Sequence, residues 1–279
     1  MPFTATSEDQ QTNVLTSARS VVFLMYHELE MPGRSLAQSD PGYLRYIVRA
    51  SDFQAQMELV KIEGWSGVSA GQALLSFEEK MVAITFDDAC ETDLLAAAPI
   101  LKRMGFGATF YATSGWIGRP GHLSPSQLRE LASFGFEIGC HSMNHVYLTD
   151  LSTSDLKREI VDAKVQLEQI SGVPVEHLSC PGGRFDNRVA EVARNAGYLS
   201  VATSQIQANH SSINRFGLGR IAIMRDTPLG DFRNCYHGHR LWQLKVGVVL
   251  REAAMKLLGN SAYDRLRGAM LRTQRSGLS

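Results

Sequence analysis

The sequence predicts an α/β fold in which parallel strands alternate with helices around a (β/α) barrel. Short apolar runs rich in β-forming residues alternate with amphipathic helical patterns through most of the chain. The number of these strand–helix units favours a barrel over a two-layer sheet. The length of 279 residues also suits one barrel, a fold that typically uses roughly 250 residues.

The expected strands are apolar runs that end at polar or turn residues. The first, Val21–Tyr26, follows a polar N-terminal lead over residues 1–20 and ends at His27. Further strands are expected at Met81–Phe86, Gly107–Tyr111, Phe136–Cys140, His177–Cys180 and Leu199–Thr203. Recurring proline and glycine between Glu28 and Ala50 predict a long loop.

Helices are expected between these strands. Ser51 is a candidate N-cap for a helix in which Phe53, Met57, Val60 and Ile62 are expected to be buried. Ser124 is the next clear candidate N-cap, because Pro125 follows it at the first helical position. The expected helices after the first are Leu94–Met104, Pro125–Ser133, Ser154–Ile170 and Asn187–Ala196. No linker or internal repeat divides residues 21–239, so one domain is expected there.

Charge and composition exclude several classes of protein. Lys and Arg number 28, Asp and Glu also 28, and 44% of residues are hydrophobic, which argues against a disordered chain and against nucleic acid as a partner. Residues 1–20 lack the basic start and apolar core of a secretory signal, so a cytoplasmic protein is expected. The four cysteines, Cys90, Cys140, Cys180 and Cys235, are too sparse for a disulfide framework and are expected to be small buried residues.

Three polar segments follow predicted strands. Asp87 and Asp88 follow the second strand, His141 and His145 follow the strand that ends at Cys140, and a Pro181–Gly183 turn follows Cys180. Each has an ordinary structural interpretation, as a solvated turn, a core histidine or a simple loop. Because barrel strands deliver side chains to one C-terminal face, the segments can instead form one site, and a helical turn at 141–145 would place both imidazoles on one metal.

Together these segments resemble the polysaccharide deacetylases of the NodB type, carbohydrate esterase family 4. Thr85–Ala89 (TFDDA) is similar to the family's TFDDG motif, His141–His145 (HSMNH) to its H-[ST]-x-x-H motif, and Pro181–Gly183 to part of its third motif. Gly105–Tyr111 (GFGATFY) resembles a further strand of the family. The resemblance covers about residues 21–223 and implies a distorted barrel, often of seven strands, that hydrolyses N-acetyl groups with a divalent metal.

By this resemblance Asp88, His141 and His145 are the metal ligands and Asp87 is the general base. Two histidines and one carboxylate leave coordination positions open for water and substrate, as a catalytic metal requires. Zn²⁺ is the expected ion, and Co²⁺, Ni²⁺ and Fe²⁺ also suit these ligands. A backbone N–H near Tyr111 or Ala112 is expected to stabilise the oxyanion, and the Pro181, Gly182 and Gly183 backbone to approach the substrate.

Two features depart from the family pattern. The late Leu-x-x-His motif that supplies the general acid is absent, but Leu24–His27 has the same pattern at the first strand and resembles a circularly permuted branch that includes poly-N-acetylglucosamine deacetylases. His27 is therefore expected to be the general acid. Ser179 stands where many relatives carry the arginine that tunes the base, so Arg220 or Arg184 is expected to pair with Asp87 instead.

Residues 240–279 form a basic C-terminal extension. Eight Lys and Arg residues against two acidic ones alternate with apolar residues, a pattern typical of an amphipathic helix or a hinged helix pair. Docking on the barrel is the ordinary interpretation. The alternative is contact with an anionic membrane surface or with a lipid or nucleotide carrier of the substrate.

The sequence thus predicts a metal-dependent hydrolase that removes N-acetyl groups from an amino-sugar glycan or glycan precursor. An O-acetyl esterase or a non-carbohydrate amidase would use the same water, base and metal. A chain that binds glycans without catalysis is a third alternative, since Ser179 and the missing late histidine both depart from the family pattern.

Overall fold

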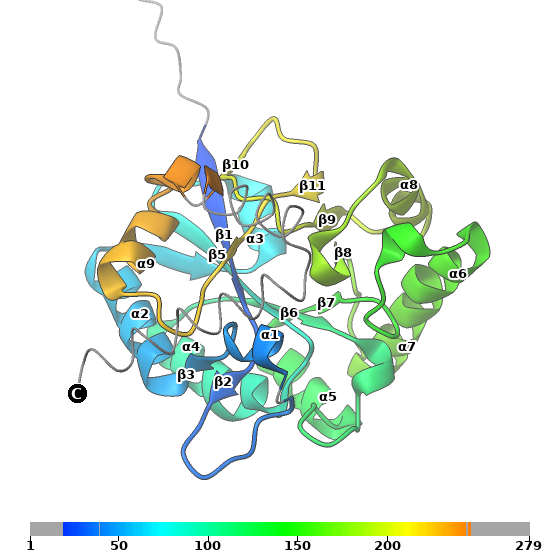
Figure 1. Ribbon diagram of the computed structural model, residues 1–279, viewed down its shortest axis with the longest axis horizontal. Helices are drawn as coiled ribbons and strands as arrows, with labels where there is room; N and C mark the ends of the chain where they lie inside the picture. Colours follow the sequence, from blue (N-terminus) through cyan, green and yellow to red (C-terminus); the bar gives the residue numbers. More distant parts are fainter. Residues whose placement is uncertain (1–18, 39, 244, 247–279) are drawn as a thin grey trace, which may run out of the picture.

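The computed structural model describes residues 19–38, 40–243 and 245–246 (Figure 1). The strands are β1 Ser20–Tyr26, β2 Leu29–Glu30, β3 Val48–Arg49, β4 Ser66–Val68, β5 Met81–Asp87, β6 Thr109–Ala112, β7 Glu137–Cys140, β8 His177–Ser179, β9 Ser200–Ala202, β10 Asn209–His210, β11 Phe216–Leu218 and β12 Ile221–Ala222. The α-helices are α1 Pro41–Leu44, α2 Ala50–Ile62, α3 Ala70–Ser76, α4 Ala98–Met104, α5 Pro125–Ser133, α6 Thr153–Lys157, α7 Ala163–Ser171, α8 Asn187–Asn195 and α9 Leu229–Tyr236. Shorter turns are the π-helical η1 Asp93–Ala97 and η4 Arg158–Asp162, and the 3₁₀ turns η2 Ser114–Trp116, η3 Leu148–Asp150 and η5 Pro181–Gly183.

The main sheet is the predicted distorted barrel. Its strands follow the order β10-β1-β5-β6-β7-β8-β9-β11, with β4 added beside β5 and β12 beside β1. Seven strands of this path run parallel, and β10 lies antiparallel to β1. The path therefore has eight strands where the family resemblance implied seven, the additional one being the two-residue β10. Helices α2, α4, α5, α7 and α8 lie around the sheet (Figure 1).

A short segment nearly closes the barrel. Phe216 in β11 pairs with Val201 of β9, while Ile221 in β12 pairs with Leu24 of β1. Only Gly219 and Arg220 separate the two strands, so residues 216–222 bridge the two sides of the sheet. We call this segment the seam.

Burial on both faces explains why the central strands are apolar without alternation. All seven residues of β5 and six of the seven in β1 are buried, as expected for parallel strands covered by helices on one face and by the barrel interior on the other. Aromatic rings extend this core outwards: Phe86 stacks on Tyr26 and Phe110 at centroid distances of 5.3 and 5.0 Å, and Phe53 of α2 meets Tyr26 edge-on.

Several expected elements differ in detail. The loop expected at Glu28–Ala50 contains β2, α1 and β3, and the following helix begins at Ala50 with Arg49 as N-cap, so Ser51 is not its cap. The prediction that Ile62 is buried is wrong: it is the last residue of α2 and its side chain is exposed. The unit β4–α3 was not predicted, because β4 has three residues and includes a glycine. The helix expected at Ser154–Ile170 is interrupted by the π turn η4, and the helix expected at Leu94–Met104 begins within η1.

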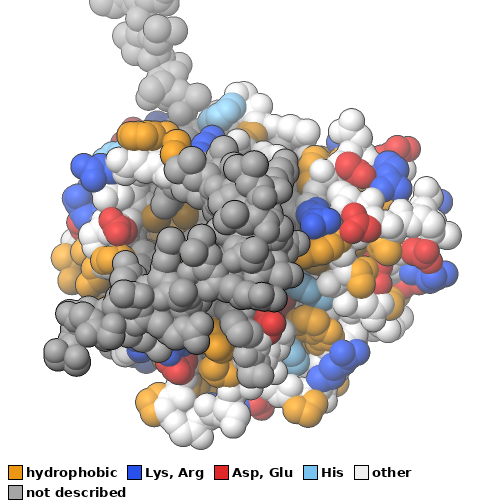
Figure 2. Space-filling model, in the orientation of Figure 1, with side chains coloured by type: hydrophobic (Ala, Val, Ile, Leu, Met, Phe, Trp, Pro, Cys, Tyr) orange, Lys and Arg blue, Asp and Glu red, His pale blue; other side chains and the backbone are white. Residues whose placement is uncertain are grey.

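The terminal segments are described only in part. The N-terminal lead over residues 1–20 is described at residues 19–20, and the helical extension expected over 240–279 at 240–243 and 245–246, so the prediction of a basic amphipathic helix lies outside the described residues. All four cysteines are free and buried. Figure 2 shows basic and acidic side chains intermixed on the described part of this face. Among the described helices, none is both long and apolar enough to cross a bilayer.

Candidate active site

The structure brings Asp88, His141 and His145 together at the C-terminal end of the barrel. Asp88 directly follows β5 and His141 directly follows β7. Nε2 of His141 lies 3.6 Å and Nε2 of His145 3.4 Å from Oδ1 of Asp88, and the three candidate ligand atoms all lie within 4.8 Å of one another. Asp88 and His141 are buried, whereas His145 is partly exposed.

These three side chains fit a divalent cation. Oδ1 of Asp88 is buried and has no hydrogen-bond partner among the described residues, a costly state for a carboxylate oxygen unless a cation satisfies it. Nδ1 of His141 lies 3.0 Å from the carbonyl oxygen of Ser179. Since a carbonyl can only accept, Nδ1 is the protonated nitrogen and Nε2 presents its lone pair towards Asp88.

Burial also keeps the ligands in suitable protonation states. It lowers the pKa of His141 to about 3, with the charge of Asp87 acting in the opposite direction, and it also lowers the pKa of His145. Both imidazoles are therefore neutral at pH 7, as metal ligation requires. Burial raises the pKa of Asp88 to about 6, despite the opposing charge of His27. A cation at this point would favour the ionised carboxylate.

The loops that carry the ligands adopt strained backbone conformations. Asp88, Ala89, Ser142 and His145 all have positive φ, at 82°, 57°, 63° and 56°. This left-handed region costs a residue with a Cβ about 1–2 kcal/mol. Ala89 stands where the family motif has glycine. Residues 141–145 do not form the helical turn considered from the sequence, and the left-handed residues at 142 and 145 bring the two imidazoles together instead.

The side chain of Glu159 holds the histidine loop in place. It lies in the π turn η4 and accepts hydrogen bonds from the backbone N–H groups of Met143 and Asn144, at 2.9 Å each, and from Nδ2 of Asn144 at 2.7 Å. π turns recur at functional sites because the extra residue redirects side chains. Sequence analysis missed Glu159, since a glutamate within an amphipathic helix is normally a surface residue; the amphipathic pattern alone contains no signal for this role.

Arg220 lies against Asp87 and binds both of its carboxylate oxygens. Nη1 donates to Oδ1 at 2.7 Å and Nη2 to Oδ2 at 2.8 Å, while Nη2 also donates to Oγ of Ser179 at 2.7 Å. Both charged side chains are fully buried. Burial alone would raise the pKa of Asp87, but the charges of Arg220 and His141 hold it well below its usual value. Asp87 is therefore ionised at neutral pH.

The seam explains how Arg220 reaches this position. It lies between β11 and β12, so its side chain enters the barrel where the sheet closes and also donates through Nε to the carbonyl of Thr203 at 3.0 Å. The pairing with Asp87 considered for Arg184 is not formed. That side chain lies over the ring of Tyr147 and within 3.4 Å of Asp150 at the surface.

His27 lies directly after β1 at the same end of the barrel. Its ring packs against those of Tyr43 and Tyr46, with centroids 6.1 and 5.0 Å away. Burial lowers the pKa of His27, while the charges of Asp88 and Asp87 act in the opposite direction, which places this imidazole in the electrostatic field of both aspartates. Nδ1 is buried without a hydrogen-bond partner among the described residues.

The remaining candidates occupy the walls of the site. Tyr111 faces Asp87 across the β5–β6 pair, and its buried ring lies 5.4 Å from the guanidinium of Arg220. Pro181–Gly183 forms η5. A Cβ at Gly182 would lie 2.5 Å from the ring of Tyr147, and one at Gly183 would lie 2.3 Å from Oγ of Ser204. Close packing and positive φ, at 62° and 70°, therefore require glycine at both positions; the expected approach of this backbone to the substrate stays a prediction.

Comparisons with known proteins agree with this geometry. Residues 75–201 match the family model of polysaccharide deacetylases. The chain is 27% identical over 206 residues to the protein YxkH of Bacillus subtilis, covering 72% of this chain and 70% of that one. It is 34% identical over 127 residues to the peptidoglycan-N-acetylglucosamine deacetylase of Bacillus cereus, covering 45% of this chain and 57% of the relative.

Solved structures share the fold. The Streptococcus pyogenes deacetylase PplD in complex with acetate superposes with a TM-score of 0.70 at 24% identity, covering 79% of this chain and 99% of that one. IcaB from Ammonifex degensii gives 0.67 at 20% identity, covering 78% and 97%. The matched segment includes Asp87, Asp88, His141 and His145. Residues 75–201 are thus similar to the polysaccharide deacetylases, the family whose model they match.

Proposed function

We propose that this protein is a metal-dependent deacetylase that releases acetate from N-acetylated amino sugars in a glycan or glycan precursor. The observation that carries the proposal is that two adjacent buried carboxylates, Asp87 and Asp88, lie in different electrostatic surroundings. Asp87 is neutralised by Arg220, and Asp88 faces two neutral imidazoles with an oxygen left unpartnered. Relatives named as deacetylases of peptidoglycan N-acetylglucosamine and of chitooligosaccharides support an N-acetylhexosamine substrate.

Asp88, His141 and His145 would hold the cation. A divalent ion of the Zn²⁺, Co²⁺, Ni²⁺ or Fe²⁺ class, once bound, would polarise the acetyl carbonyl and lower the pKa of water. The carbonyl of Ser179 fixes the orientation of the His141 ring. Glu159 fixes the backbone on which His145 is carried.

Asp87 accepts the proton of the attacking water. Arg220 donates to both oxygens of the carboxylate, so its orientation is fixed before the substrate arrives. Oδ2 also accepts a hydrogen bond from Oγ of Ser179, which leaves the second lone pair of Oδ1 to accept a proton. Arg220 also stabilises the ionised form of Asp87, which keeps the base active at mildly acidic pH.

His27, in its protonated form, donates a proton to the departing amine; burial disfavours this form, and the charges of Asp88 and Asp87 favour it. An amine leaves slowly unless a proton reaches its nitrogen as the carbon–nitrogen bond breaks, so an acid is required opposite the base. His27 belongs to β1, whereas Asp87 belongs to the neighbouring β5, and both lie at the C-terminal ends of these strands. The tyrosine rings around His27 limit its contact with water and its range of orientations.

The decisive experiment measures acetate release by purified protein loaded in turn with Zn²⁺, Co²⁺, Ni²⁺ and Fe²⁺. Substrates are an N-acetylglucosamine oligosaccharide and an O-acetylated sugar, and Asp87→Asn is the control. We expect metal-dependent release from the N-acetylated substrate and loss of about a thousandfold or more in kcat in Asp87→Asn. Release from the ester alone, little affected by His27→Ala, would indicate an O-acetyl esterase. Glycan binding without hydrolysis by any metal form would contradict the proposal.

A further inference from the structure

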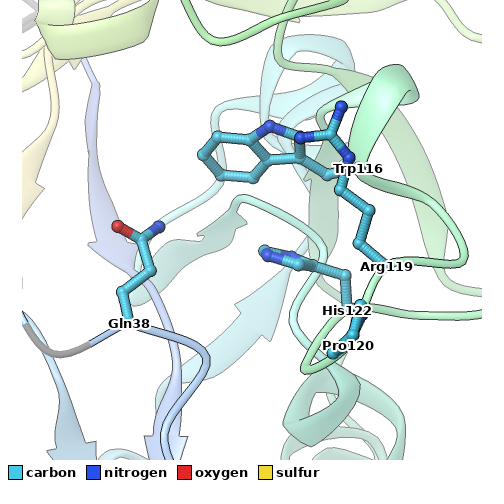
Figure 3. A pocket seen from close by; sticks show the side chains of 5 residues that line it. All are labelled: Gln38, Trp116, Arg119, Pro120 and His122. Atoms are coloured by element: carbon cyan, nitrogen blue, oxygen red, sulfur yellow. The ribbon is translucent and has the colours of Figure 1, made fainter.

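A cavity of about 320 Å³ lies beside the metal ligands (Figure 3). Its walls are formed by Gln38, Trp116, Arg119, Pro120 and His122. Figure 3 shows Trp116 and Arg119 along one wall, Gln38 across from them, and the imidazole of His122 pointing into the space between. The volume is at the lower end of the range for small-ligand sites and is sufficient for one sugar ring.

Two contacts join this cavity to the proposed metal centre. The indole of Trp116 stacks on the imidazole of His145, with centroids 4.9 Å apart and an angle of 30° between the planes. His122 lies at the same centroid distance from Trp116, and its Nδ1 is 3.2 Å from the carbonyl oxygen of Asp88. The cavity and the proposed metal ligands therefore share a wall, formed by Trp116 and His122.

The lining residues are suited to a sugar that carries a negative charge. The exposed face of Trp116 offers a flat apolar surface on which a sugar ring can lie. Nδ1 of His122 donates to the Asp88 carbonyl, so in the neutral ring Nε2 is an acceptor for a hydroxyl group. Gln38 adds an amide. The charged lining residue is Arg119, whose planar guanidinium matches carboxylate and phosphate oxygens.

Arg119 is exposed, and no carboxylate of the described chain forms an ion pair with it. Three other arginines around the site are paired with carboxylates: Arg184 with Asp150, Arg34 with Glu91 and Arg220 with Asp87. An anionic group of the substrate would supply the missing partner. Among the described residues, no acidic side chain lines the cavity to oppose such a group.

We propose that this cavity is a specificity subsite that binds a sugar carrying a carboxylate or phosphate next to the N-acetylated sugar. Arg119 binds the anionic group, Trp116 stacks on the ring, and His122 and Gln38 contact its hydroxyl groups. The proposal rests on the proposed deacetylase function and extends it to a substrate class, an acidic glycan.

The test uses three disaccharides in which N-acetylglucosamine is linked to glucuronic acid, to glucose 6-phosphate or to glucose. We expect metal-loaded wild-type protein to prefer an acidic disaccharide over the glucose one by about tenfold in kcat/KM, mainly through KM. Arg119→Ala should reduce this preference about tenfold, and Arg119→Lys should retain part of it. The matched control, Arg103→Ala, removes an exposed arginine on α4 that contacts Gln54 and should leave the preference unchanged.

A binding measurement separates this proposal from the proposed function. The same disaccharides are titrated into metal-free wild-type protein and Arg119→Ala by calorimetry. Preferential binding of an acidic disaccharide that depends on Arg119 supports the subsite even if no acetate is released, in which case only the deacetylase function fails. Equal binding and equal kcat/KM for the acidic and glucose disaccharides would overturn the subsite, as would an Arg119→Ala effect of the same size on all three. The difference in affinity between the glucuronic acid disaccharide and the glucose 6-phosphate disaccharide shows whether the subsite prefers a carboxylate or a phosphate.

Discussion

The two ends of the barrel each hold a histidine 3.6 Å from a carboxylate, yet they differ in how well the polar atoms are satisfied. At the C-terminal end the pair is His141 and Asp88, and at the N-terminal end it is His177 and Glu137. Glu137 accepts hydrogen bonds from Oγ of Ser69, the N–H of Gly71 and Oγ1 of Thr109. Nδ1 of His177 is paired with Oγ of Ser200 at 2.8 Å. We call this pair at the N-terminal end the lower cluster and the pair at the C-terminal end the upper cluster. The side chains of the lower cluster find hydrogen-bond partners within the protein, without an added group.

The upper cluster is incomplete by the same measure. Oδ1 of Asp88 and Nδ1 of His27 are buried without partners among the described residues, and residues at positive φ surround them. The comparison teaches that proximity of histidine to carboxylate does not by itself identify a metal site. A candidate metal site is distinguished by two further features. Its potential ligand atoms are buried without hydrogen-bond partners, and the backbone that carries them is strained. The following predictions test this distinction, beginning with the largest expected effect.

The first prediction compares metal binding at the two clusters. His141→Ala and Asp88→Ala should each lower the amount of Zn²⁺ or Co²⁺ bound per chain to near zero. Each variant keeps only two of the three proposed ligands, and two ligands bind the ion too weakly to retain it. His177→Gln should retain full metal content. Metal analysis of the dialysed proteins measures this. If His177→Gln loses metal to the same extent, the lower cluster also takes part and the comparison fails.

The second prediction concerns the buried pair of Asp87 and Arg220. Arg220→Met leaves a buried carboxylate without its partner and should lower the free energy of unfolding at pH 7 by about 3–5 kcal/mol. Because the paired Asp87 has a lowered pKa, its contribution to stability is present above the unfolded pKa of about 3.9 and is lost as pH falls through the folded value. In the variant, burial without the guanidinium raises the pKa of Asp87, so the deficit should shrink from pH 7 towards pH 4 as this carboxylate takes up a proton. The part that the paired wild-type carboxylate contributes should be lost only below pH 4.

Urea unfolding at several pH values measures that deficit, and the double variant Asp87→Asn/Arg220→Met is the control. It should recover much of the stability, because no unpaired charge remains in the barrel. In the single variant Arg220→Met, the pKa of Asp87 should rise. The acidic side of the plot of kcat/KM against pH should therefore move to higher pH. An unmoved acidic side would show that Arg220 does not set the protonation of the base.

The third prediction concerns Glu159, which supports the upper cluster from the π turn. Glu159→Gln removes the charge and leaves one accepting oxygen. If that oxygen keeps the hydrogen bonds of the 143–144 backbone, the NH₂ group faces Nδ2 of Asn144, and two donors meet there. The affinity for Zn²⁺ should fall roughly 10–100-fold while the fold is retained. Glu191→Gln on the exposed face of α8 is the matched control. Equal affinities in both variants would assign Glu159 a role in stability alone.

The smallest expected effect is that of Ala89→Gly. Relief of the left-handed strain at φ 57° is worth about 1–2 kcal/mol, and loss of the buried methyl costs about 0.8 kcal/mol. The variant should therefore be more stable by about 0.5 kcal/mol in urea unfolding. Ala98→Gly in α4 serves as the opposite case and should be less stable by about 1 kcal/mol. A clear loss of stability in Ala89→Gly would mean that packing outweighs strain at this loop.

Much of the site could be predicted from the sequence, because strand ends determine where its residues meet. Asp87, Asp88 and His141 each lie at the end of a strand that local apolar patterning already identifies. The choice between Arg220 and Arg184 could not be made in this way. Arg220 is 133 residues from Asp87, and only the seam brings them together. Glu159 and the Trp116 cavity also escaped prediction, since both depend on packing between elements distant in sequence.

The seam has a consequence for the order in which the protein becomes active. Arg220 is held by the pairing of β11 with β9 and of β12 with β1, so a barrel that is open at the seam would leave Asp87 without the guanidinium that binds both of its oxygens. Under the proposed function, the segment from β1 to β9 would then carry the carboxylate and the candidate metal ligands but lack the group that orients the base. Closure of the seam would complete the site.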